Sequence, residues 1–314
     1  MRAPLSGVVI PVCTPLTADG TAVDEASLRR HLDRLVTAGV DGVFILGTSG
    51  EFGFLTDEQR RFVLEVTADE IGGRLPVLVG ISDTATARAV AQAEMLIPLG
   101  ADAVVATAPF FAASGPMEIG EHFRQIRRAI GQMPLFAYEN PGRVNGESIP
   151  AALAIELAGD GINEGVKDSS GDRSYMDALL RGRERHGLST LSILSGSEVD
   201  ADWAILAGAD GLVPGLGNVD PRGYVDLVEL ARGGEVEQAG VEQERLRKLF
   251  GIVSIRTREP MGDSSRSLGA FKAAMKMLGA IDHDPCAPPS VRLGDDERRT
   301  IEQILLEHGP EGVE

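Results

Sequence analysis

Short apolar runs alternate with helix-like segments along most of the chain. The runs are rich in Val, Ile and Leu, as parallel strands buried on both faces are. Eight runs are present, at residues 7–12, 42–46, 76–81, 103–107, 135–138, 162–167, 191–194 and 211–213. Between them lie helix start and stop signals, such as Asp24 before and Gly39 after one amphipathic stretch, and Thr56 with Gln59 as a capping box. The alternation predicts an α/β fold, a closed (β/α)8 TIM barrel. An open doubly wound sheet is less favoured, because no G-x-G-x-x-G follows the first run.

Beyond residue 221 the pattern is helical only. Helices are predicted at residues 221–232, 235–255, 264–279 and 295–308, and a proline-rich connector at 282–289 precedes the last one. The first of these helices completes the barrel. We therefore expect two parts, a barrel over residues 1–232 that carries the active site and a C-terminal helical extension over residues 233–314. Residues 309–314 are expected to be frayed.

Composition and charge narrow the class of protein. Of the 314 residues, 43% are apolar and 25% charged, the balance of a soluble globular protein. The net charge of −17 disfavours nucleic acid and anionic membranes as partners. No signal-peptide pattern and no apolar run of membrane-spanning length is present. The two cysteines, Cys13 and Cys286, form no C-x-x-C pair, which favours a reducing, cytoplasmic location.

The most informative candidate for chemistry is Lys167, which closes the sixth apolar run. Enzymes with this barrel carry their sites at the carboxyl ends of the strands. An amine withdrawn from water at such a position can attack a carbonyl, and the resulting Schiff base is an electron sink. The alternative is a strand-end lysine that faces solvent or pairs with Asp168. Only four of the 30 basic residues are lysines, which favours the catalytic interpretation.

A glycine-rich loop follows the second run. Gly47 precedes Thr48 and Ser49, and this arrangement predicts inward backbone N–H groups and two hydroxyls that suit a small carboxylate. A purely structural turn is the alternative, because glycine turns after strands are common. Glu51, at the end of the loop, is expected to be a structural hydrogen-bond partner.

Tyr138 lies one strand before Lys167 and is one of three tyrosines. A phenol close to a Schiff base can carry protons, although a space-filling barrel tyrosine is the alternative. Strand alternation places Tyr138 and Asn140 on one face and Glu139 on the other.

Cys13 is expected in the core. The sequence shows no metal constellation, and the histidines, expected at the surface or in helices, follow no strand end: His31, His122, His186, His283 and His308.

Together these motifs resemble the dihydrodipicolinate synthase / N-acetylneuraminate lyase family. The resemblance rests on Gly47–Glu51, Tyr138 with Asn140, and Gly165–Asp168, in this order. It implies a class I, pyruvate-dependent aldolase on a (β/α)8 barrel, without metal or organic cofactor. The Schiff-base lysine would be Lys167, the proton-transferring tyrosine Tyr138, and the pyruvate-carboxylate ligands Thr48 and Ser49. A cytoplasmic homotetramer, a dimer of dimers, or else a dimer is implied as well.

The sequence also departs from the synthase pattern of that family. Phe110 and Phe111 stand where synthases carry a tyrosine pair, and phenylalanine transfers no proton. Arg143 lies where synthases have an arginine for the carboxylate of the aldehyde substrate; it could also clamp a sugar acid. Glu139 replaces the usual asparagine, and Gly215, with a second glycine two residues on, opens the loop after the eighth run.

These features favour a carbon–carbon lyase that splits a longer 2-oxo acid, a 2-keto-3-deoxy sugar acid, into pyruvate and an aldehyde, or condenses them. Three alternatives stay open. One is 4-hydroxy-tetrahydrodipicolinate synthase proper, of lysine biosynthesis. Another is a dehydratase of keto-deoxy sugar acids. The third is a non-catalytic barrel that binds a keto acid and regulates a partner.

Overall fold

A closed barrel of eight parallel strands forms the centre of the protein. The computed structural model describes residues 5–310. The strands follow one another around the barrel in sequence order, and β8 pairs with β1 to close it. They are β1 (Gly7–Pro11), β2 (Gly42–Ile45), β3 (Val77–Gly80), β4 (Ala103–Ala106), β5 (Leu135–Glu139), β6 (Gly165–Asp168), β7 (Ser192–Ser195) and β8 (Gly211–Leu212). The predicted fold class is confirmed.

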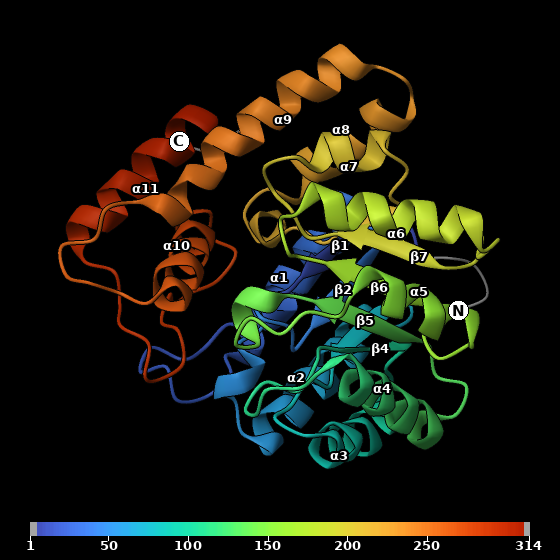
Figure 1. The fold of residues 1–314 in the computed structure, drawn as a ribbon. Coiled ribbons are helices and arrows are strands. Elements are labelled where there is room, and N and C mark those ends of the chain that lie inside the picture. Colours follow the sequence, from blue (N-terminus) through green and yellow to red (C-terminus); the bar gives the residue numbers. More distant parts are fainter. Residues whose placement is uncertain (1–4, 311–314) are drawn as a thin grey trace.

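One helix follows each strand and covers the outside of the barrel (Figure 1). The helices are α1 (Glu25–Ala38), α2 (Asp57–Ile71), α3 (Thr86–Leu96), α4 (Pro116–Ile130), α5 (Ala151–Gly159), α6 (Arg173–Arg185), α7 (Ala201–Leu206) and α8 (Pro221–Arg232). The predicted caps are present. Asp24 accepts a hydrogen bond from the Ser27 backbone N–H, Gly39 has a φ of 81°, and Thr56 and Gln59 form the capping box.

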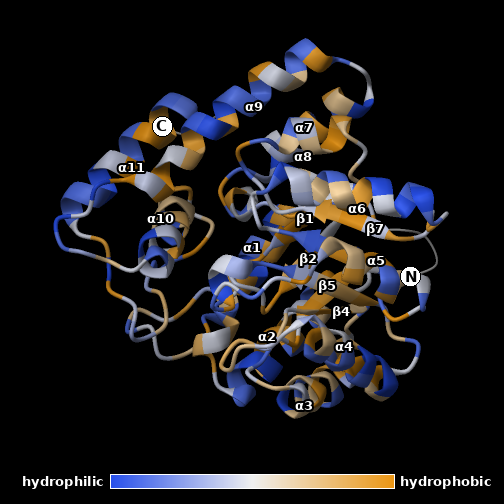
Figure 2. Cartoon of the chain, in the orientation of Figure 1, coloured by the Kyte–Doolittle hydropathy of each residue, from blue (hydrophilic) through white to orange (hydrophobic). Residues whose placement is uncertain are grey.

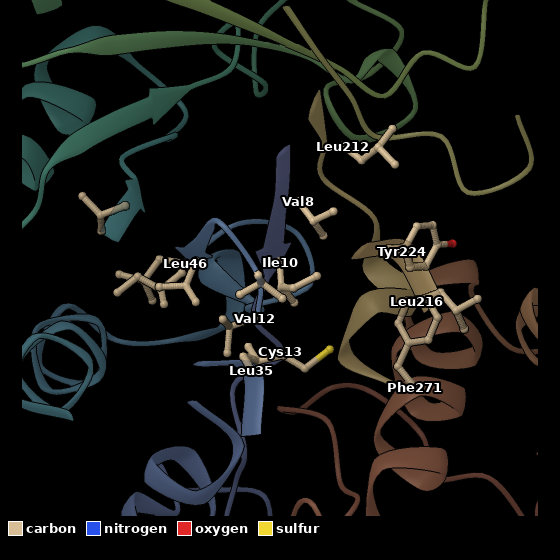
Figure 3. Packing of buried hydrophobic residues seen from close by; sticks show 14 of the residues in the cluster. Val8, Ile10, Val12, Cys13, Leu35, Leu46, Leu212, Leu216, Tyr224 and Phe271 are labelled. Atoms are coloured by element: carbon tan, nitrogen blue, oxygen red, sulfur yellow. The ribbon is translucent and has the colours of Figure 1, made fainter. Parts of the chain in front are cut away.

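Side-chain alternation along the strands divides the core into two layers. Val9, Phe44, Leu78 and Phe136 belong to a smaller cluster that also contains Tyr138 and fills the barrel interior. The residues between them face the helices, where Val8, Ile10 and Leu212 pack in the larger cluster (Figure 3). Several strands are accordingly apolar throughout, while the helices are polar on their outer faces (Figure 2).

The C-terminal extension consists of α9 (Val236–Phe250), a 3-10 turn (Gly251–Ser254), α10 (Asp263–Met277) and α11 (Asp295–His308). These helices lie together on one side of the barrel (Figure 1). Phe271 of α10 belongs to the same core cluster as Leu216 in the loop after β8 (Figure 3). The division at residue 232 stays a prediction, and four residues of the predicted frayed tail, 311–314, lie outside the described range.

Two boundaries differ from the predictions by three residues or more, and others by one or two. β6 begins at Gly165, three residues later than expected, because the start of the apolar run is still tied to the end of α5: the Ile162 backbone N–H donates to the Leu157 carbonyl oxygen at 2.8 Å. The helix predicted over residues 235–255 ends at Phe250 and tightens into the 3-10 turn.

His31 and His122 lie in helices, as expected, but both are buried. Over residues 5–310, no helix is both long and apolar enough to span a membrane.

Candidate active site

Lys167 and Tyr138 meet at the carboxyl end of the barrel. They are register partners on β6 and β5, so both side chains project to the same face of the sheet. The Lys167 Nζ atom lies 3.7 Å from the centroid of the Tyr138 ring and 5.4 Å from that of Phe44. Both side chains are buried. Asp168, the alternative partner of the lysine, instead accepts a hydrogen bond of 2.8 Å from the Ser170 backbone N–H.

The Tyr138 hydroxyl is surrounded by polar groups. Asn140 Nδ2 donates a hydrogen bond to it at 2.7 Å, and Thr48 Oγ1 lies 3.3 Å away. Burial by itself raises the pKa of the phenol. The positive charge of Lys167 and the hydrogen-bonding groups around the hydroxyl outweigh that effect, so the pKa of Tyr138 lies below its ordinary value. This arrangement favours a phenol that gives up its proton readily to a neighbouring group.

The glycine-rich loop follows β2 in a tightly folded conformation. Leu46 and Glu51, at its two ends, have left-handed φ angles of 54° and 58°. A Cβ atom at Gly50 would lie 2.8 Å from the Leu46 backbone nitrogen, so only glycine fits there. The loop presents Thr48 and Ser49, both half-buried, to the same cavity as Lys167.

That cavity has a volume of about 240 Å³ and two kinds of wall. The barrel side is largely polar. The other side belongs to the C-terminal extension and is largely apolar. The barrel side includes Thr48, Ser49, Tyr138, Asn140, Arg143, Lys167, Ser169, Glu198 and Gly215, and the extension adds Phe250, Val253, Ser267, Leu268 and Phe271. The cavity thus brings together six of the seven predicted site residues, all except Gly47. Gly47 precedes Thr48 in the loop, and a Cβ atom at this position would lie 2.6 Å from the Phe44 ring.

Glu198 is a cavity residue that sequence reasoning did not select. It follows β7, and its Oε1 accepts the Gly215 backbone N–H at 2.8 Å. Burial raises the pKa of Glu198 to about 7, against the opposing hydrogen bond from Gly215. Gly215 is required for this contact, because a Cβ atom there would lie 3.1 Å from the same carboxylate oxygen and 2.9 Å from the Phe271 ring. The position of Glu198 shortly after the end of β7 is the feature from which the sequence could have identified it.

Arg143 lies farther out, on a short 3-10 turn (Pro141–Arg143) after β5. Its guanidinium donates a hydrogen bond to Ser264 Oγ in the first turn of α10. The side chain borders the main cavity and also an adjoining one of about 380 Å³, where Phe52 and Phe110 form part of the wall. Arg143 therefore lies where the two cavities meet.

The remaining predicted residues are structural. Glu139 faces away from Lys167, as predicted, and its carboxylate accepts hydrogen bonds of 2.7 Å from Ser148 Oγ and the Ile149 backbone N–H. Glu51 forms a buried ion pair with Lys272, a partner that the sequence did not reveal. Cys13 is buried in the core, and burial raises the pKa of its thiol. Within residues 5–310, no three His, Cys, Asp or Glu side chains gather closely enough to hold a metal ion.

Comparisons with known proteins agree with this geometry. A sequence model of the Dihydrodipicolinate synthetase family matches residues 4–308. An uncharacterized DapA-like lyase of Halobacterium salinarum is 33% identical over 97% of this chain and 94% of its own length. A probable 2-dehydro-3-deoxy-D-pentonate aldolase of Escherichia coli K12 is 26% identical over 97% of each chain. The solved dihydrodipicolinate synthase of Bacteroides thetaiotaomicron is 31% identical, with a TM-score of 0.90 over 98% of this chain and all of that one (100%).

The family match spans nearly the whole chain, and the family consists of lyases and synthases on this barrel. The non-catalytic alternative is therefore set aside, and the protein is an enzyme of the lyase class. The chain belongs to the dihydrodipicolinate synthetase family.

Proposed function

We propose that the enzyme forms a Schiff base at Lys167 and cleaves a 2-keto-3-deoxy sugar acid to pyruvate and an aldehyde, or condenses the two. The observation that carries this proposal is the position of Lys167 Nζ, 3.7 Å above the ring of Tyr138, in a cavity that Thr48 and Ser49 also line. A nucleophile, a proton carrier and carboxylate-binding hydroxyls around one small space are what imine chemistry on a 2-oxo acid requires.

The proposed reaction starts when the Lys167 amine attacks the C2 ketone and water leaves, which gives a protonated imine. Tyr138 removes the proton of the C4 hydroxyl, directly or through the substrate carboxylate or a water. The C3–C4 bond then breaks, its electron pair moves into the C2–nitrogen system, and the aldehyde departs. Protonation of the resulting enamine at C3, followed by hydrolysis, releases pyruvate and regenerates the amine. Thr48 and Ser49 hold the carboxylate throughout.

The outer part of the cavity indicates the class of substrate. Glu198 and Asn140 offer hydrogen-bonding groups to hydroxyls, and Arg143 offers a cation at the distal end. The relative named as a pentonate aldolase supports a sugar acid. The second candidate is 4-hydroxy-tetrahydrodipicolinate synthase, which the Bacteroides structure and the position of Arg143 favour. Against it stands Phe111, whose side chain is apolar at a position where a synthase relay needs a hydroxyl.

Product analysis separates these candidates. The purified enzyme is incubated with a panel of 2-keto-3-deoxy sugar acids, and free pyruvate is measured with lactate dehydrogenase. Cleavage releases pyruvate and an aldehyde, whereas a dehydratase releases water and keeps the carbon skeleton. Lys167→Ala should lower turnover at least about a thousandfold, because the nucleophile is lost. Normal turnover by this variant, or condensation activity confined to aspartate semialdehyde, would contradict the proposal.

Assembly and location form part of the same proposal. We infer a homotetramer built as a dimer of dimers, and a cytoplasmic location. Two apolar side chains, Phe111 in the loop after β4 and Met117 in the first turn of α4, are 84% and 85% exposed, which favours burial against another copy of the chain. Cys13 and Cys286 are free, as a reducing compartment requires. Light scattering of the purified protein tests the assembly, and a monomeric mass at micromolar concentration contradicts it.

A further inference from the structure

The second buried lysine of the structure, Lys272, lies beside the candidate site but outside its cavity. Its ammonium forms an ion pair with Glu51 Oε1, and both side chains are 0% exposed. It also donates a hydrogen bond of 2.9 Å to the Pro285 carbonyl oxygen. The other carboxylate oxygen, Glu51 Oε2, accepts the Ala287 backbone N–H at 2.6 Å. The pair thus joins three segments, namely the loop after β2, helix α10 and the connector before α11.

These contacts reach the proposed carboxylate-binding groups through one loop. Glu51 lies two residues after Ser49 and three after Thr48, and it has a left-handed φ of 58°. A non-glycine residue stays in that conformation only where its surroundings hold it. Both Glu51 oxygens are held, and Thr14 Oγ1 fixes the neighbouring Gly50 carbonyl oxygen at 2.8 Å. The loop is therefore fastened immediately behind its hydroxyl groups.

Stability alone does not account for a pair of this kind. Removing two charges from water has a large desolvation cost, and a well-packed neutral pair is often as stable. What an ion pair adds is a short and strong charge-assisted contact, which holds the two segments that carry it close together. The neighbours of Lys272 on α10 agree with a local role, since Phe271 and Leu268 line the cavity itself.

We propose that Lys272 is a positioning residue, which sets the carboxylate-binding geometry of Thr48 and Ser49 through its ion pair with Glu51. The inference rests on the proposed function and deepens it. In this account the C-terminal extension shapes recognition of the keto acid through α10, without touching the reacting atoms.

The test compares two ketones that differ in the carboxylate. Borohydride trapping at Lys167 is measured against the concentration of pyruvate and of methyl pyruvate, whose ester carries no negative charge. The variant is the double substitution Glu51→Gln with Lys272→Met, which leaves no unpaired buried charge. We expect the half-saturating pyruvate concentration to rise about tenfold, because the hydroxyls are misplaced. The value for methyl pyruvate should change little, so the preference for pyruvate collapses.

The double substitution Asp220→Asn with Arg245→Met provides a matched control, because it also replaces both partners of an ion pair. Arg245 on α9 pairs with Asp220, at the start of α8, at 2.7 Å, so the variant removes another ion pair between extension and barrel, away from the loop. Its preference for pyruvate should stay that of the wild type. If the double variant also keeps that preference, the inference is wrong.

A second variant keeps the test decisive if the double variant does not fold. Glu51→Asp keeps both buried charges and shortens the acidic side chain by one methylene group, so the contacts with Lys272 and Ala287 cannot be kept unless the loop moves. It should weaken the preference for pyruvate in the same direction, and an unchanged preference would overturn the inference. Trapping of pyruvate at Lys167 in the wild type tests the proposed function, independently of the variants. Wild-type trapping at Lys167, together with unchanged variants, overturns only the role of Lys272.

Discussion

Two side chains on neighbouring strands, Lys167 and Tyr138, carry the proposed chemistry at the scale of single residues. The barrel supplies their alignment, because β5 and β6 run in register and both residues face inward. The positive charge of the lysine lowers the pKa of the phenol, although burial by itself raises it. The same phenol contacts Thr48 and Asn140, so proton transfer and substrate binding meet at one hydroxyl.

Tyr138→Phe separates imine formation from proton transfer. The variant keeps the ring below Lys167 and removes only the hydroxyl. Turnover should fall about 10² to 10⁴-fold, the range typical of general acid–base catalysis, while pyruvate is still trapped at Lys167. Steady-state kinetics and trapping measure the two effects. Tyr175→Phe is the control. The Tyr175 hydroxyl donates to the Ile149 carbonyl oxygen at 2.8 Å, outside the cavity, so this variant should turn over normally.

Glu198 predicts a pH dependence of substrate binding. Its pKa of about 7 means that the carboxyl is neutral below this pH and charged above it. The kcat/KM of the wild type should therefore change in a step near neutral pH. Glu198→Gln fixes an uncharged side chain, so this step should vanish from its profile. A step that persists unchanged in the variant would assign the titration to another group.

At the scale of secondary-structure elements, the site is assembled by the loops after β2, β5, β7 and β8 and closed by the C-terminal helices. The strand-end residues could be predicted from the sequence, because strand ends of a barrel share one face. The closing wall could not, since Phe250 and Phe271 have the pattern of ordinary core residues in amphipathic helices. The partner of Glu51 lies 221 positions away in α10, and no local pattern connects the two.

Gly215→Ala tests the packing between the loop after β8 and α10. The added methyl group would lie 2.9 Å from the Phe271 ring and 3.1 Å from Glu198 Oε1, so both side chains must shift. KM for the full-length substrate should rise about tenfold, while saturation by pyruvate, which is bound by the β2 loop, stays the same. Gly240→Ala in α9 is the control, since no atom beyond the neighbouring helix backbone lies within 4 Å of its Cβ position. An equal loss of affinity for the substrate and for pyruvate would show that Gly215 and the β2 loop do not serve separate parts of the substrate.

At the scale of the whole molecule, the barrel interior and the helix layer are both closely packed, and buried polar groups join the two. His31 illustrates a signal that sequence analysis could have used. It lies on the face of α1 that also carries Leu28, Leu32 and Leu35, and all four side chains are 0% exposed. Its Nε2 lies 3.0 Å from Asn218 Oδ1, which also accepts the Cys13 backbone N–H. The histidine therefore links α1 to β1 and to the loop after β8.

The buried histidines predict a loss of stability in mild acid. Burial lowers the pKa of His31 to about 3 and that of His122 to about 4, from the ordinary histidine value of about 6.5. Below pH 6.5 the unfolded chain binds protons that the folded one does not, so the free energy of unfolding falls as pH falls. Each histidine contributes a slope of up to about 1.4 kcal/mol per pH unit. The free energy of unfolding is measured by urea titration at several pH values. Plotted against pH, it should fall less steeply for a variant with both histidines replaced by Gln than for the wild type. Parallel plots for the two proteins would contradict the assignment.

We propose that Lys167 is the amine that forms the imine. The most direct measurement is borohydride reduction in the presence of pyruvate, followed by digestion and mass spectrometry of the lysine-containing peptides. We predict an adduct on the peptide that contains Lys167 and none on Lys272, whose ammonium is fully buried against Glu51 and the Pro285 carbonyl oxygen. An unmodified Lys167 after reduction with saturating pyruvate would contradict the imine mechanism.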